Sequence, residues 1–338
     1  MSHSRRSVLT RGAGLLAAGA ATSIAGCSGA ADGEAAGFDG GYAAFFTLND
    51  WANEVVGDRA SFENPVEVGR LGHGWTPDGT LAADVASTDA FVYLDSLEFA
   101  WAQDLAATLE ADYDSVAVVD ALADVGDDLL DWDRSHEGEG ERDGHEGEGD
   151  EHDEDTRDDR QYDPHVWVDP VLAARMVETI ATGLGEADPE NADAYAANAT
   201  AYGEELAAVD SGFESIAADA DRDVAVIAGH NSFQYLEARY GFRLHSPVGV
   251  SPQNEPSQSQ IADTIELVNA AGIDTVLYDR FESTTLAETV VENSDATEMR
   301  AVSPAGGTTE EWNDAGYGYL EQMTEVNLPA FERAFGVQ

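Results

Sequence analysis

The sequence contains no lysine, so all 16 of its basic residues are arginine, and they stand against 67 aspartates and glutamates. The formal net charge of −51 over 338 residues repels nucleic acid and excludes it as a partner. We expect a protein adapted to high salt, because at molar ionic strength the Debye length is about 3 Å and surface repulsion is screened. The alternative, acidic patches that collect cations, is less favoured because the acids are spread along the whole chain.

Cysteine and long apolar runs are nearly absent as well. The single cysteine, Cys27, excludes an intramolecular disulfide, and no apolar run is long enough to span a bilayer as a stable helix. Residues 1–26 are instead typical of an export signal, with Arg5 and Arg6 in a twin-arginine context and a tetrapeptide ending at Cys27 that resembles a lipoprotein cleavage box. We expect Cys27 to carry the lipid that holds the exported protein at the outer face of the cell membrane; an uncleaved, unlipidated cysteine is the alternative. Residues 27–41 are then a flexible stalk.

Beyond residue 41, short apolar runs alternate with helical patterns, which is typical of α/β domains with mostly parallel sheets. The hydrophobic content of 43% is enough for one or two buried cores. Strands are expected at 42–48, 66–71, 89–94 and 115–120, and in a second series at 224–229, 274–278 and 298–303, with helices between them such as 97–110. The sequence therefore predicts an α/β fold of two similar lobes with central, mostly parallel sheets, an N-terminal lobe over 42–187 and a C-terminal lobe over 220–338.

One long helix is predicted between the lobes, over residues 188–219. Its larger apolar residues recur every three, four or seven positions, which places them on one helix face. Asp188 and Pro189 favour a capped start, and roughly 30 residues at 1.5 Å each give a length of about 45 Å. A rigid connector of this length runs along both lobes and permits only small lobe movements.

The stretch 133–160 is predicted to be a disordered insertion in the first lobe. It holds 14 acids, four arginines and three histidines, with hardly an apolar side chain to bury. Its histidines, His136, His145 and His152, either collect divalent metal loosely or belong to a solvated, salt-adapted loop, and the sequence leaves both readings open.

Outside the signal and this loop the chain has four histidines, and three of them follow a pattern. His73 and His230 each follow an expected strand, at the sheet edge where open α/β folds bind ligands. His165 lies between two Asp-Pro steps in YDPHVWVDP, where proline fixes the backbone and the second step favours the start of a helix. Rigidly placed histidines from both lobes predict a metal site, whereas His245 is expected to be exposed or hydrogen-bonded.

The sequence resembles the zinc/manganese family of solute-binding proteins of ABC transporters over nearly the whole mature chain. FFTLNDWANEVVGD is similar to the family's opening strand and helix, while DPHVWVDP, after an acidic loop with histidines, and HNSFQYLEARYGF are similar to later segments. The resemblance implies metal ligands at His73, His165 and His230. Histidine at the third position is typical of zinc members and glutamate of manganese members, and three neutral imidazoles suit Zn²⁺ better than Mn²⁺.

Two features depart from the family's pattern. Gly72 precedes His73, where the family usually has proline or an acid. The segment VSPAGG, from which the family often takes a fourth ligand, has Gly306 and no acid. The fourth ligand is then a water or an acid such as Asp279 or Glu310, and Asp279 is the named candidate.

These observations predict a monomer that captures Zn²⁺ outside the cytoplasm, between its lobes, and delivers it to an ABC permease without making or breaking a bond. A three-histidine zinc metalloenzyme is the first alternative, although the sequence has no H-E-x-x-H pattern and no evident acid one turn from a ligand to act as general base. A surface adhesin with incidental metal is the second alternative, and it predicts that the three histidines lie far apart.

Overall fold

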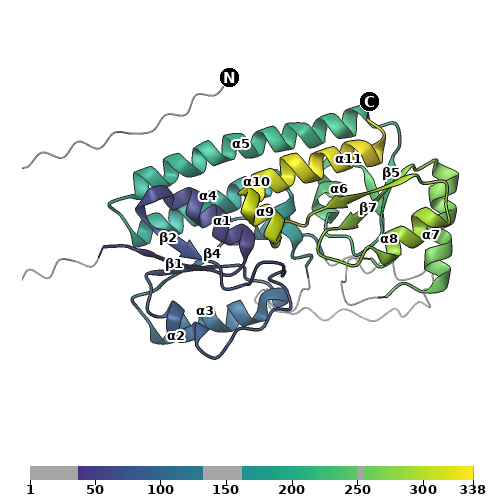
Figure 1. Cartoon of the computed structure of the whole chain (residues 1–338). Helices are drawn as coiled ribbons and strands as arrows, with labels where there is room; N and C mark the ends of the chain where they lie inside the picture. The colour runs from purple at the N-terminus through teal and green to yellow at the C-terminus, as the bar shows by residue number, and fades with distance from the viewer. Residues whose placement is uncertain (1–36, 132–161, 250–254, 338) are drawn as a thin grey trace, which may run out of the picture. The chain divides into compact units, whose positions relative to one another are not determined.

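The computed structural model describes residues 37–131, 162–249 and 255–337 (Figure 1). The contacts between residues define two units of the chain, with the boundary after Gly37. Both sheets belong to the unit that begins at Phe38. The expected signal, Cys27, most of the expected stalk and the acidic stretch 133–160 lie outside the described residues. Within the described residues, no helix is both long and apolar enough to cross a membrane.

Two parallel sheets of four strands each form the centres of two lobes. The first has the strand order β2-β1-β3-β4 and the second β6-β5-β7-β8, so the same topology occurs twice and the predicted pair of similar lobes is confirmed. The strands are β1 Gly40–Ala43, β2 Ser61–Glu63, β3 Ala90–Tyr93, β4 Ala117–Asp120, β5 Val224–Ile227, β6 Arg243–His245, β7 Thr275–Asp279 and β8 Glu298–Val302.

Two expected strand assignments near the N-terminus need correction. β1 begins at Gly40, inside the expected stalk, and ends at Ala43, because α1 already starts at Phe46. The expected strand 66–71 is irregular, and β2 lies before it. Gly69, with φ of 88°, breaks the extended backbone that the apolar pattern suggested, and Val68 is 45% exposed rather than buried in a sheet.

Helices flank both sheets and connect the strands (Figure 1). They are α1 Phe46–Val56, α2 Leu81–Val85, α3 Ala100–Asp112, α4 Pro170–Ala187, α5 Ala192–Asp219, α6 Gln234–Tyr240, α7 Gln258–Ala271, α8 Thr285–Glu292, α9 Glu310–Ala315, α10 Tyr319–Glu321 and α11 Leu328–Phe335. The predicted start of α4 is confirmed, since the Asp169 side chain accepts hydrogen bonds from the backbone of Val171 and Leu172, with Pro170 in the first turn.

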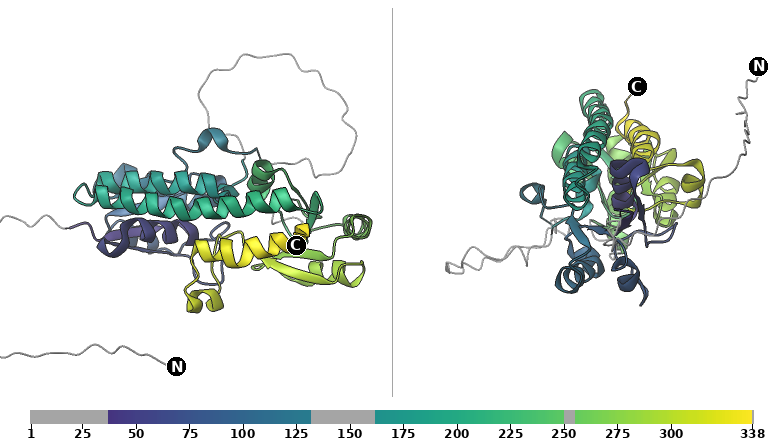
Figure 2. Two further views of the ribbon diagram at one scale, coloured as in Figure 1. Left: turned by 90° about the horizontal axis from the view of Figure 1, so that it is seen from above. Right: turned by 90° about the vertical axis from the view of Figure 1, so that its left-hand side faces the viewer.

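The long helix α5 packs against α1 and α4 of the first lobe and against α6 and α11 of the second (Figures 1 and 2). Its 28 residues correspond to about 42 Å. It begins at Ala192 and not at Asp188, because Asp188 ends α4 and accepts hydrogen bonds from Asn191 and Tyr195. The face predicted to be apolar is buried, and its members are Tyr195, Tyr202, Leu206, Val209, Phe213 and Ile216.

The C-terminal part of the chain returns to the first lobe after β8. The Asp50 carboxylate on α1 accepts a hydrogen bond from the backbone N–H of Tyr319 at 3.0 Å and one from the Tyr202 hydroxyl at 3.4 Å. The Tyr319 hydroxyl donates to the carbonyl of Trp167 at 2.6 Å. Residues after β8 therefore hold the two lobes together, although the sequence placed them wholly in the second lobe.

The buried carboxyl group of Asp50 leads to a testable prediction about the pH dependence of stability. Burial, opposed by the Tyr319 N–H, raises the pKa of Asp50 from 3.8 to about 6. The folded state therefore binds a proton more tightly than the unfolded chain, and this group lowers stability as pH rises from about 4 to about 6, by up to about 3 kcal/mol. We expect Asp50→Asn, which can still accept the Tyr319 hydrogen bond, to raise the melting temperature at pH 7.5 and to have little effect at pH 4. Thermal unfolding at both pH values tests this, and an equal gain at both would contradict it.

Candidate metal centre

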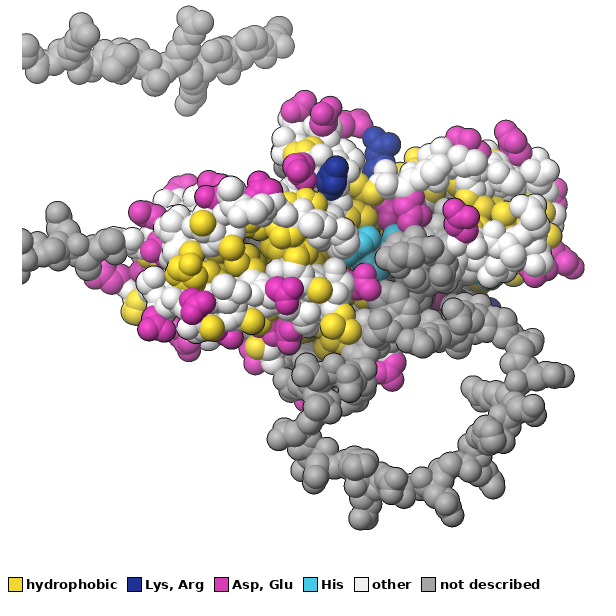
Figure 3. All heavy atoms as spheres, turned by 90° about the horizontal axis from the view of Figure 1, so that it is seen from below, with side chains coloured by type: hydrophobic (Ala, Val, Ile, Leu, Met, Phe, Trp, Pro, Cys, Tyr) yellow, Lys and Arg dark blue, Asp and Glu magenta, His cyan; other side chains and the backbone are white. Residues whose placement is uncertain are grey.

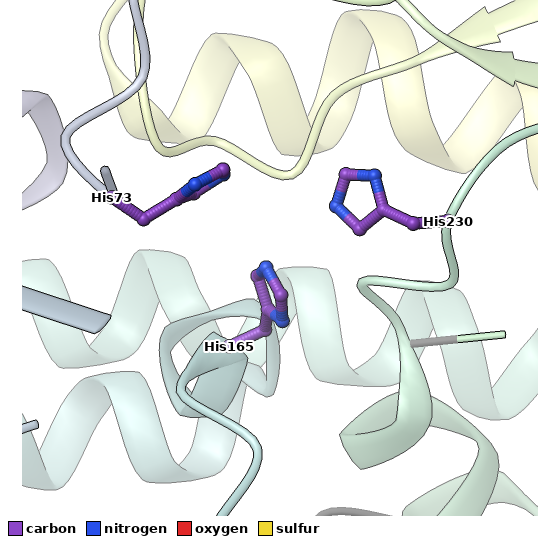
Figure 4. Close-up of side chains that lie close together, drawn as sticks. All are labelled: His73, His165 and His230. Atoms are coloured by element: carbon purple, nitrogen blue, oxygen red, sulfur yellow. The ribbon is translucent and has the colours of Figure 1, made fainter. Parts of the chain in front are cut away.

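Three histidines from separate parts of the sequence converge on one point (Figure 4). The ring centroids of His73, His165 and His230 lie 6.2, 6.3 and 5.7 Å apart pairwise, and one nitrogen from each ring lies within 4.8 Å of the others. His165 and His230 are buried and His73 is half-buried. We call these three residues the histidine triad. Its geometry suits a single ion with three imidazole ligands.

Histidine side chains reach the surface between the two lobes (Figure 3). Apolar side chains gather on the adjoining face of the first lobe. Acidic side chains lie beside the histidines as well, so an ion that enters from this face meets both apolar and acidic neighbours.

His73 lies on a loop between β2 and α2 and not directly after a strand, as the sequence suggested. The preceding Gly72 packs so tightly that an added Cβ would lie 2.5 Å from the Cβ of Phe45 and 2.9 Å from Cε1 of Phe99. No larger residue fits there without a shift. Position 72 packs so closely on the aromatic core that only glycine fits. This is the physical reason why the chain departs from the family pattern here.

We expect Gly72→Ala to displace the His73 loop. The added methyl group overpacks the Phe45–Phe99 stack, which destabilises the fold by about 1–3 kcal/mol and weakens zinc binding by about tenfold or more. Gly79 has open space around its Cα, so Gly79→Ala is the matched control and should change neither property. Calorimetric zinc titration of both variants would check this; unchanged affinity in Gly72→Ala would contradict it.

His165 lies in the 3₁₀ turn His165–Val168, which follows Pro164. Its Nδ1 lies 2.7 Å from Oδ1 of Asp163, an aspartate that is fully buried, and its Nε2 is buried without a partner. Because a carboxylate accepts a hydrogen bond, Nδ1 carries the proton and the Nε2 lone pair is left for a metal. The sequence pattern marked Asp163 only as part of an Asp-Pro step and did not predict its hydrogen bond to His165.

His230 follows β5 and has two polar neighbours that the sequence analysis missed. Its Nδ1 is hydrogen-bonded to Oε1 of Glu282, and Oγ of Ser232 lies 2.6 Å from its Nε2. Glu282 therefore fixes the Nδ1–H tautomer, as Asp163 does for His165. The Ser232 hydroxyl satisfies Nε2 in the metal-free protein and must turn away when Nε2 binds an ion.

Asp279 ends β7, the strand beside β5, and is 2% exposed. Its Oδ1 accepts the backbone N–H of Phe281 at 2.8 Å, and its Oδ2 is buried without a partner. A carboxylate oxygen of Asp279 lies within 4.8 Å of ligand atoms of both His230 and Glu282. Asp279 does not form such a cluster with the other two histidines. Glu310, the other acid considered, is exposed at the start of α9. The structure thus places Asp279 beside one ligand of the triad and not in a common sphere with all three.

Burial and neighbouring charges shift the pKa values of groups in and around the histidine triad. Burial, together with the charges on His165 and His230, lowers the pKa of His73 to about 3, so this ring is neutral at neutral pH. Burial also acts to lower the pKa of His230, but the hydrogen bond to Glu282 and the charges of Asp279 and Glu282 outweigh it and raise that pKa. Burial raises the pKa of Asp279 to about 7. A dication held by neutral rings would be balanced by carboxylates just outside them.

The chain is similar to known proteins over most of its length. A family profile described as ZnuA, zinc-uptake complex component A, periplasmic, matches residues 42–334. The zinc-binding lipoprotein AdcA of Streptococcus pneumoniae is 29% identical over 289 residues, which are 86% of this chain and 54% of that protein. The high-affinity zinc uptake system protein ZnuA of Bacillus subtilis is 26% identical over 288 residues, 85% of each chain. The chain thus spans about half the length of the AdcA relatives.

Solved structures share the fold. The Zn(II)-bound ZnuA-like domain of S. pneumoniae AdcA is 25% identical, with a TM-score of 0.68, over 87% of this chain and 97% of that domain. The metal-dependent lipoprotein YcdH of B. subtilis, 22% identical with a TM-score of 0.70 over 87% of this chain and 98% of that one, supports the fold alone. The profile match over most of the sequence and the repeated lobe topology lead to one conclusion: this chain belongs to the ZnuA family of solute-binding proteins.

Proposed function

We propose that this protein captures Zn²⁺ between its lobes outside the cytoplasm and delivers it to an ABC permease. The observation that carries the proposal is the convergence of His73 and His165 from one lobe with His230 from the other. Two of the three rings have a buried Nε2 without a partner, a state that costs free energy unless an ion or a donor fills it. The names of the relatives AdcA and ZnuA, both tied to zinc, support the same ion.

We propose His73, His165 and His230 as the direct ligands. Three imidazoles without a carboxylate in the same sphere favour Zn²⁺ over Mn²⁺, which prefers oxygen. The fourth position is then filled by water or, after a small movement, by Asp279. As the structure stands, Asp279 and Glu282 act from outside the sphere and balance the charge of the ion.

Localisation and partners are part of the proposal. The cleavage-box tetrapeptide, and the lipoprotein name of the AdcA relative, support a lipid on Cys27 that tethers a monomer beside its permease. Cell fractionation of Cys27→Ala should then find the protein outside the membrane fraction, and continued membrane association would overturn the lipid assignment.

The geometry of the site is less favourable to the two alternatives, a zinc metalloenzyme and a surface adhesin. A hydrolytic enzyme needs a site open to a substrate, whereas His165 and His230 are only 2% and 1% exposed. The adhesin alternative predicts widely separated histidines, and their nitrogens instead lie within 4.8 Å of one another.

Competition between Zn²⁺ and Mn²⁺ tests the function. The chain lacking residues 1–26, in molar KCl to screen its acidic surface, should bind zinc about 100-fold or more tightly than manganese. Zinc should also raise the melting temperature, since a ligand at 100 times its Kd stabilises the folded state by about 2.7 kcal/mol. Equal affinity for the two ions would contradict the zinc assignment, and no binding of either would overturn the transport site.

A further inference from the structure

A short segment of the second lobe lies directly on the two loops that carry the ligands of the first lobe. This segment is Pro304–Thr308, which follows β8, and we call it the crossing segment. At one end the Trp167 indole N–H donates to the Pro304 carbonyl at 2.6 Å, two residues after His165. At the other end the Gly69 N–H donates to the Thr308 carbonyl at 2.8 Å, four residues before His73.

Two adjacent glycines let the backbone of the crossing segment pass close to the backbone of the His73 loop. The space available for a side chain differs between the two positions. A Cβ added at Gly307 would lie 2.4 Å from the carbonyl oxygen of Arg70, a backbone atom that cannot turn aside. A Cβ added at Gly306 would meet Leu71 at 3.5 Å and Trp167 at 3.6 Å, which are ordinary contacts. Glycine is therefore required at 307 for the His73 loop to pack where it does, and it is not required at 306.

Buried polar groups from both lobes fix the crossing segment. The Gln322 side-chain amide donates to the Gly307 carbonyl at 3.0 Å, and the Thr47 hydroxyl of α1 donates to the Ala305 carbonyl. Ala305 has φ of 54°, and among the described residues it alone adopts a positive φ without being glycine. A non-glycine residue keeps this conformation only where its surroundings enforce it. The segment is thus a rigid spacer and not a loose loop.

We propose that the crossing segment positions His73 and His165 against His230, so that the second lobe sets the spacing of the whole histidine triad. This inference rests on the proposed role of the triad in zinc binding. Because one segment contacts both N-lobe ligand loops, a shift of this segment displaces His73 and His165 together relative to His230.

The adjacent glycines supply a matched pair of variants. We expect Gly307→Ala to weaken zinc binding by about tenfold or more and to change the visible absorption of bound Co²⁺, whose spectrum reports coordination geometry. Gly306→Ala should leave both unchanged. Zinc competition and Co²⁺ titration of the purified chain measure both properties. A Gly307→Ala protein with wild-type affinity and spectrum would overturn the proposal, as would equal losses in the two variants.

A second variant, with a smaller structural effect, tests the proposal if Gly307→Ala does not fold. Thr47→Val keeps the shape of the side chain and removes its hydrogen bond to Ala305. We expect a loss of zinc affinity of about threefold to tenfold, the range of one hydrogen bond, with a shifted Co²⁺ spectrum. An unchanged spectrum would contradict the proposal. If His230→Ala abolishes zinc binding while Gly307→Ala and Thr47→Val leave it intact, the positioning role fails and the zinc site stands; if His230→Ala has no effect, the site itself fails.

Discussion

Replacing His230 by alanine is expected to weaken zinc binding by about 100-fold to 1000-fold. Zinc sites with four ligands bind with apparent free energies of roughly 10–16 kcal/mol, so one ligand contributes about 2.5–4 kcal/mol. His230 is also the sole triad member from the second lobe. Without it the two remaining rings, His73 and His165, hold an ion from one side only. Isothermal titration or competition with a zinc chelator in molar KCl measures the loss.

Two controls separate the triad from the other histidines of the chain. His245 lies in β6, where its Nε2 is 2.9 Å from the Thr264 hydroxyl, as the hydrogen-bonded role predicted for it requires, so His245→Ala should leave zinc affinity unchanged. Removal of residues 133–160 deletes three histidines but none of the triad, and we expect a much smaller loss than for His230→Ala. If the deletion and His230→Ala cost the same, the metal site has been assigned to the wrong histidines.

The three histidines were predictable from the sequence because their local contexts were informative. His230 lies three residues after β5, a strand that the apolar pattern located well, and His165 lies on a segment that proline makes rigid. His73 was grouped with them because it follows an expected strand, and the resemblance then implied the same three residues. The element before His73 was assigned wrongly, because an alternating apolar run predicts a strand even where Gly69 turns the backbone away. The structure nevertheless brings His73 together with His165 and His230, and its role as a metal ligand stays a prediction.

The partners of the histidines were harder to predict, because they depend on strand order and on side-chain packing. Glu282 reaches His230 since β7 lies beside β5 in the sheet, with β6 on the other side, and the apolar runs alone do not give that order. The need for glycine at position 72 arises from the packed rings of Phe45 and Phe99, which are distant in sequence. Sequence patterns locate elements, whereas such contacts follow from how the elements pack.

Zinc binding is expected to weaken as pH falls, with a profile set mainly by His230. The pKa of this ring is raised above its usual value, and below that pKa zinc must displace a proton from it. Affinity should therefore be flat above the pKa of His230 and fall about tenfold per pH unit below it. His73, with a pKa of about 3, remains neutral through this range and adds nothing to the slope. Chelator competition between pH 8 and pH 5 gives the profile.

Glu282→Gln should shift that profile in a direction that a mere loss of stability would not produce. The change removes the charged acceptor that raises the pKa of His230, so the fall in affinity should begin at a lower pH than in the wild-type protein. At high pH the variant should bind zinc about tenfold to 100-fold more weakly, because the neutral amide is a weaker acceptor for the Nδ1–H and no longer balances the charge of the ion. Glu288→Gln, on the exposed side of α8, should reproduce the wild-type curve. A Glu282→Gln profile that begins to fall at the wild-type pH would show that Glu282 does not control the protonation of His230, and the charge balance argued for the site would then need another source.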